Sequence, residues 1–102
     1  MKNMNSLFDF LIKCTKNNKN FDFYDIKVSN SIQRLHESIE NYDNTTNKII
    51  PNNFELVKKG RVNGFICEID KKDIKDIKKF KRELKSNDFD VTTKNTKLII
   101  RS

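Results

Sequence analysis

The chain has 102 residues, with 21 Lys or Arg against 14 Asp or Glu, and therefore a formal net charge of +7. This length fits one domain with a modest core, and the charge favours an anionic partner such as nucleic acid. The chain opens on a short amphipathic run without a long apolar segment, so we expect neither a secretory signal nor a membrane span.

The first predicted element is an amphipathic helix or arm within residues 1–20. Ser6 is a candidate N-cap, and apolar residues then recur at helical spacing: Leu7, Phe8, Leu11 and Cys14. A helix this short is only marginally stable in isolation, so it must dock on its own domain or on a partner. We expect it to dock on its own domain. In the alternative, Leu7, Phe8 and Leu11 form a partner-docking surface.

Residues 21–102 are predicted to form a single α+β domain. It begins with a strand over 21–28, because Tyr24, Ile26 and Val28 alternate with polar residues. A helix capped by Ser29 or Ser31 follows and runs to about residue 42. A second strand is expected over 54–58, after which the segment 59–64 turns the chain back.

The most informative stretch, 64–101, reads strand, helix, strand. The strand covers 65–69, and Asp70 is the expected N-cap of a helix over 71–85. One stripe of this helix is apolar: Ile74, Ile77, Phe80 and Leu84. Two short strands with a turn at residues 94–95 end the chain.

The predicted fold class is therefore α+β. A short N-terminal helix precedes the order β-α-β-β-α-β, which is the ferredoxin-like split βαβ arrangement of a four-stranded sheet with two helices on one face.

Cations occupy the side of the 71–85 helix opposite its apolar stripe: Lys71, Lys72, Lys75, Lys78, Lys79, Arg82 and Lys85. Three more lie in the preceding turn: Lys58, Lys59 and Arg61. These ten residues are the predicted nucleic-acid-binding site, because a phosphate backbone would relieve their mutual repulsion and release counterions. Lys94, Lys97 and Arg101 would extend the same surface. The alternative is an ordinary solvated, lysine-rich face.

The sequence offers no catalytic or metal-binding pattern, and we expect neither an enzyme nor a cofactor, metal or small-molecule substrate. His36 is the single histidine, and Cys14 and Cys67 are far apart without a metal-ligand spacing. The two glycines, Gly60 and Gly64, do not form a phosphate-cradling loop.

These patterns favour a small RNA-binding structural protein of a ribonucleoprotein. The expected setting is translation, as a ribosomal protein that contacts rRNA phosphates and neighbouring proteins. The composition, rich in Lys, Asn, Ile and Phe, is typical of an A/T-rich genome. The expected location is a reducing intracellular compartment, either a mitochondrial or other organellar ribosome or the cytoplasm. The alternative is a protein of a virus, phage or mobile element that binds a host protein through its N-terminal helix.

Overall fold

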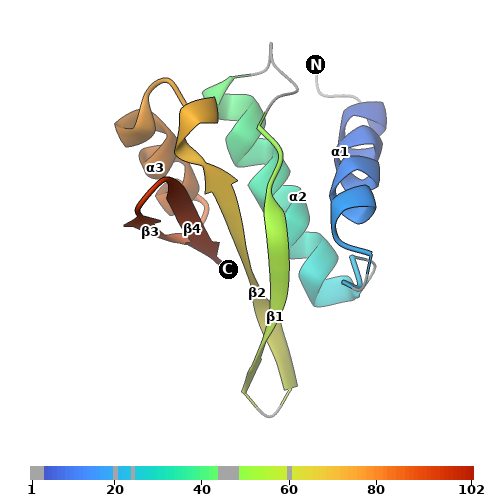
Figure 1. The fold of residues 1–102 in the computed structure, drawn as a ribbon. Helices are drawn as coiled ribbons and strands as arrows, with labels where there is room; N and C mark the ends of the chain where they lie inside the picture. The colour runs from blue at the N-terminus through green and yellow to red at the C-terminus, as the bar shows by residue number, and fades with distance from the viewer. Residues whose placement is uncertain (1–3, 20, 24, 44–48, 60) are drawn as a thin grey trace.

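The computed structural model describes residues 4–19, 21–23, 25–43, 49–59 and 61–102. These residues form a mixed α+β fold with one antiparallel four-stranded sheet in the order β1-β2-β4-β3 (Figure 1). In chain order the elements are α1 (Met4–Asn17), α2 (Ile26–Tyr42), β1 (Asn52–Lys59), β2 (Arg61–Asp70), the short 3-10 helix η1 (Lys71–Asp73), α3 (Ile77–Ser86), β3 (Asp90–Lys94) and β4 (Lys97–Arg101).

The core lies between one face of the sheet and the helices. Phe65, Cys67 and Ile69 are buried along β2, and the residues between them are only half-buried. In β4, Leu98 pairs with Ile69 and Ile100 pairs with Cys67, so their buried side chains share that face. α2 and α3 pack side by side against it, and α1 lies on the other side of α2 (Figure 1).

The strand predicted over 21–28 is wrong, because α2 already begins at Ile26. The carboxylate of Asp25 accepts hydrogen bonds from the backbone N–H groups of Lys27 and Val28, at 3.1 and 3.3 Å, and so caps the helix. Ile26 is 77% exposed, whereas Val28 starts the buried stripe of α2. Tyr24, the first residue of the predicted alternation, lies outside the described part of the chain.

Ser29 and Ser31 were the predicted caps of this helix, and both instead lie inside it. The Ser29 hydroxyl donates to the carbonyl of Ile26 three residues earlier, and Ser31 is buried. The 3.6-residue repeat of the helix, in place of the two-residue repeat of a strand, explains why this segment is helical. Val28 falls in phase with the later buried residues of the stripe, namely Ile32, Leu35 and Ile39, so helical burial overrides two-residue alternation.

The helix predicted over 71–85 is divided in two. η1 ends at Asp73, Ile74 has an extended backbone, and α3 begins at Ile77. The predicted cap Asp70 makes no side-chain capping bond, whereas the carboxylate of Asp76 accepts from the N–H of Lys79 at 3.1 Å. The break leaves Ile74 buried, so the stripe residue keeps its burial but leaves the helix.

The structure confirms the prediction of two strands near the C-terminus, but the turn between them lies at residues 95–96, one position later than predicted. Asn95 has a φ of 55°, a left-handed conformation that asparagine tolerates in turns. The ferredoxin-like order is not confirmed: the element order is α-α-β-β-η-α-β-β, since the first predicted strand is replaced by the start of α2.

Candidate nucleic-acid interface

α3 is held firmly on the body of the protein. Phe80 and Leu84 are fully buried, and the ring of Tyr42 on α2 meets the Phe80 ring edge-to-face at 5.1 Å. The Tyr42 hydroxyl also accepts a hydrogen bond from the N–H of Asp76 at 2.8 Å. At the other end of α3, Arg34 donates to the carbonyl of Asn87 at 2.7 Å. The outward side of α3 is therefore presented on a fixed support.

That outward side carries exposed cations. Arg82 points directly away from the buried stripe at the helical repeat, with Lys78 and Lys85 beside it, and all three side chains are exposed. In the described part of the chain, none of the three takes part in a salt bridge. We call Lys78, Arg82 and Lys85 the α3 cation row.

Two further lysines flank this row. The Lys79 ammonium lies 5.6 Å from the centroid of the Tyr42 ring, a cation–π contact that ties it to α2. Lys81 is half-buried at the edge of the apolar stripe. The sequence interpretation omitted Lys81, although its place between Phe80 and Arg82 already set it on the flank of the helix.

The predicted cations outside α3 have different surroundings. Lys72 within η1 and Lys75 just after it are exposed, whereas the Lys71 ammonium donates to the carbonyl of Asn95 at 2.6 Å. The side chains of Lys58, Lys59 and Arg61 lie outside the described part of the chain, as does Gly60 between them.

Lys97, which was predicted to extend the surface, has two carboxylate neighbours. Its ammonium lies 3.4 Å from Asp70 and 3.5 Å from Glu68, in a small ion cluster on β2 and β4. The hydrogen bond with Asp70, followed by the charge of that carboxylate, raises the pKa of Lys97. Lys94 and Arg101 are exposed on β3 and β4.

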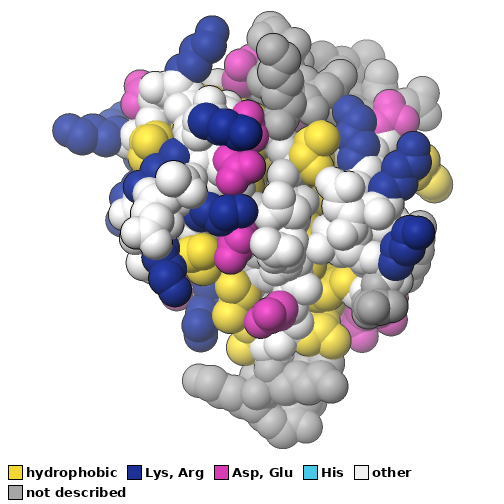
Figure 2. Space-filling model, viewed as in Figure 1, with side chains coloured by type: hydrophobic (Ala, Val, Ile, Leu, Met, Phe, Trp, Pro, Cys, Tyr) yellow, Lys and Arg dark blue, Asp and Glu magenta, His cyan; other side chains and the backbone are white. Residues whose placement is uncertain are grey.

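The sheet face away from the helices has a different character. Strand alternation and register place Ile66, Glu68 and Asp70 on this face, with Ile99 and Lys97 opposite them on β4. Figure 2 shows acidic and apolar side chains over the middle of the sheet, while Lys and Arg gather on the side that carries α3, β3 and β4, with a smaller group on the α1 side. The acids weaken the case for phosphate contacts at the centre of the sheet.

The predicted docking residues of α1 differ in exposure. Phe8 is 61% exposed, but Leu7 and Leu11 are half-buried, and Leu11 packs against the core. The side that anchors α1 is formed by Phe10 and Cys14, both buried. Of the three predicted docking residues, Phe8 is therefore the most exposed, whereas Leu7 and Leu11 offer only part of their side chains to a partner.

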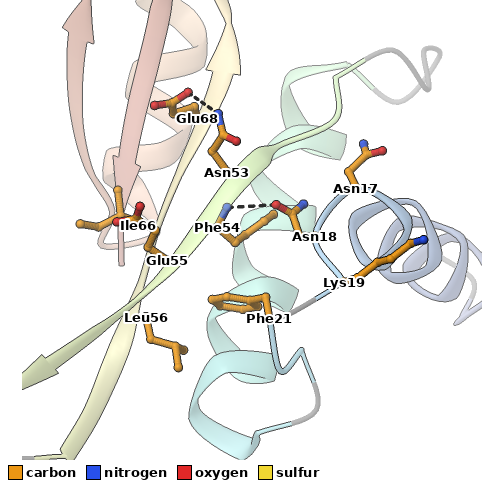
Figure 3. Close-up of a pocket in the computed structure, with 10 residues that line it drawn as sticks. All are labelled: Asn17, Asn18, Lys19, Phe21, Asn53, Phe54, Glu55, Leu56, Ile66 and Glu68. Atoms are coloured by element: carbon orange, nitrogen blue, oxygen red, sulfur yellow. Dashed lines mark hydrogen bonds between the residues drawn. The ribbon is translucent and has the colours of Figure 1, made fainter.

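A groove of about 830 Å³ lies between the end of α1 and β1 (Figure 3). Its walls come from residues 17–19, 21 and 53–56, with Ile66 and Glu68 from β2. Within it, the side-chain oxygen of Asn18 accepts from the N–H of Phe54 at 3.2 Å. This bond occupies part of the outer edge of β1, where an unpaired strand would otherwise be open to pairing with another chain.

The two thiols and the histidine, the groups most able to do chemistry, are all buried. Burial raises the pKa of Cys14 to about 12 and that of Cys67 well above its ordinary value, which disfavours the reactive thiolates. His36 lies 3.0 Å from Glu40 on the same helix. Among the described residues, no cluster of three or more His, Cys, Asp or Glu side chains is placed to hold a metal ion.

None of the described helices combines the length and apolar composition needed to cross a lipid bilayer. Comparison with family profiles, curated proteins and solved structures gave no match for this chain.

Proposed function

We propose that this chain is an RNA-binding component of a ribonucleoprotein and that its α3 cation row neutralises RNA phosphates. The observation that carries the proposal is that Lys78, Arg82 and Lys85 are exposed, lack salt bridges among the described residues, and stand on a helix anchored by Phe80 and Leu84. The net charge of +7 supplies long-range attraction to such a polyanion.

The chemistry of the row favours phosphates over base edges. Lysine acts as a flexible point charge, and the row offers one arginine and no Asn or Gln for bidentate contacts to bases. The row spans about 10.5 Å along the helix, from the rise of 1.5 Å per residue, which suits contacts with a few neighbouring phosphates. Lys72 and Lys75 would lengthen the contact beyond the start of α3. The ribosome is the assembly in which this role would be tested first.

The test compares two matched charge reversals. Lys78→Glu/Arg82→Glu removes two cations from the row, and Lys19→Glu/Lys27→Glu removes two exposed cations carried elsewhere. Both variants change the net charge equally. RNA affinity is measured across a salt series, with a short single-stranded RNA and a duplex of the same sequence, and circular dichroism checks the fold.

If the row binds phosphates, the first variant loses about 1.4 to 1.8 from the slope of log K against log salt, because each phosphate contact contributes about 0.7 to 0.9. The control variant keeps most of the parental slope. A folded Lys78→Glu/Arg82→Glu variant with the parental slope would refute the proposal, as would equal losses in both variants, which would show attraction by net charge alone.

A further inference from the structure

The outward side of α1 is an apolar surface that the rest of the described chain leaves uncovered. Phe8 is 61% exposed and Ile12 is 48% exposed, and the four-residue spacing stacks them on one side of the helix. The opposite side holds Phe10 and Cys14 in the core. Figure 1 shows α1 at the margin of the molecule, with α2 between it and α3.

Two opposite charges lie on either side of Ile12 along the helix. Asp9 and Lys16 are both exposed, and their seven-residue separation puts them on the same side of the helix as Ile12, about 10.5 Å apart along the axis. In the described part of the chain, neither takes part in a salt bridge. Along the helix the order is Phe8, Asp9, Ile12 and Lys16, so Ile12 lies between an acidic and a basic residue, and Phe8 lies beyond the acidic one.

We propose that α1 pairs antiparallel with α1 of a second copy of this chain, about a two-fold axis beside Ile12. The midpoint between Asp9 and Lys16 falls next to Ile12, so an antiparallel copy brings Asp9 of each chain opposite Lys16 of the other. The two Ile12 side chains then meet near the axis. The aliphatic stem of each Lys16 covers the Phe8 ring of the other copy, with the ammonium directed to Asp9.

The arrangement of charge selects a second copy over an unrelated partner. A two-fold interface requires a patch that is complementary to itself, and one acid and one base placed evenly about an apolar centre meet that requirement. Two helices of 14 residues bury less surface than an obligate dimer does. The association is therefore expected to be weak, so that monomer and dimer exchange as the protein concentration changes. Because α1 and α3 lie on opposite sides of α2, pairing through α1 leaves both α3 cation rows accessible (Figure 1).

The test is sedimentation equilibrium of the full chain and of two charge-reversed variants, Asp9→Lys and Lys16→Asp. The parent is expected to approach twice the 12.1 kDa mass of one chain as its concentration rises. In the dimer of each variant alone, like charges lie opposite each other at both contacts. Its dissociation constant should therefore rise roughly tenfold. An equimolar mixture of the two variants restores opposite charges at both contacts and should recover the parental association.

The control is Lys27→Asp, which reverses an exposed cation on α2 and should associate as the parent does. Phe8→Ala/Ile12→Ala should abolish association while leaving the circular dichroism spectrum unchanged, since both side chains face outward. A parent that stays monomeric at every concentration overturns the proposal and leaves the surface to a different protein. Variants that associate like the parent, with no gain on mixing, overturn it as well.

Discussion

The packing of Phe80 is the feature on which the candidate interface depends, and replacing Phe80 with alanine tests it. The ring is fully buried and meets Tyr42 edge-to-face at 5.1 Å. Truncating a buried phenylalanine removes its transfer free energy and leaves a cavity, which together cost about 3–5 kcal/mol. Domains of this size have a total stability of about 5–15 kcal/mol, so the variant should fold with a much reduced margin.

Urea denaturation followed by circular dichroism measures the effect. With a denaturant slope of roughly 2 kcal/mol per molar urea, a loss of about 4 kcal/mol lowers the midpoint by about 2 M. Phe80→Leu keeps most of the buried volume and should fall between the alanine variant and the parent. Lys78→Ala, on the exposed side of the same helix, is the matched control and should stay within about 0.5 kcal/mol of the parent.

If Phe80→Ala lowers the free energy of unfolding by less than about 1 kcal/mol, this reasoning is refuted. It would mean that α3 is not anchored on α2 through this ring, and that the α3 cation row has no fixed support. A large decrease in the free energy of unfolding of Lys78→Ala would also contradict the reasoning, because the Lys78 side chain would then contribute to packing and not face solvent.

Two further predictions concern the start of α2 and the buried thiols. Asp25→Ala should lower the free energy of unfolding by about 0.5–2 kcal/mol by removing the cap bonds to Lys27 and Val28. The control Asn30→Ala, at an exposed position inside α2, should not lower it in the same urea titration, because alanine favours a helix more than asparagine does. Cys14 has its pKa raised from 9.0 to about 12, so the unfolded chain loses this proton first and stability falls as pH rises from 9 towards 12. Cys14→Ala should reduce that fall by up to about 1.4 kcal/mol per pH unit, and an unchanged pH profile would contradict the role of burial.

The elements with a strong local signal could be predicted from the sequence. The β3–β4 hairpin follows from two apolar runs on either side of a turn at Asn95, and β1 and β2 were expected over shorter ranges than the structure gives them. The start of α2 could not be predicted in this way. Ile26 and Val28 fit a strand as well as a helix, and the choice between them depends on the Asp25 cap and on whether Val28 packs with the later residues of the helix.

The division of the 71–85 segment required tertiary information. Helical spacing includes Ile74 in the apolar stripe, and nothing in that spacing shows a break after η1. In the folded chain, the N–H of Lys71 donates to the carbonyl of Thr96 at 2.9 Å, and the N–H of Asp76 donates to the Tyr42 hydroxyl. These bonds join residues 25 to 34 positions apart, so the local sequence pattern could not predict them.

The cations of the candidate site likewise fall into two groups, those placed by the local helical repeat and those whose surroundings depend on distant residues. Lys78, Arg82 and Lys85 remain opposite Phe80 and Leu84 whether the helix begins at 71 or at 77, because their relative positions depend only on the helical repeat. The surroundings of Lys71 and Lys97 depend instead on residues distant in the sequence: Lys71 donates to the carbonyl of Asn95 in the β3–β4 turn, and Lys97 pairs with Glu68 and Asp70 on β2. A charge reversal in the α3 cation row therefore tests the surface directly, whereas the same change at Lys97 would also disturb the packing of β2 against β4.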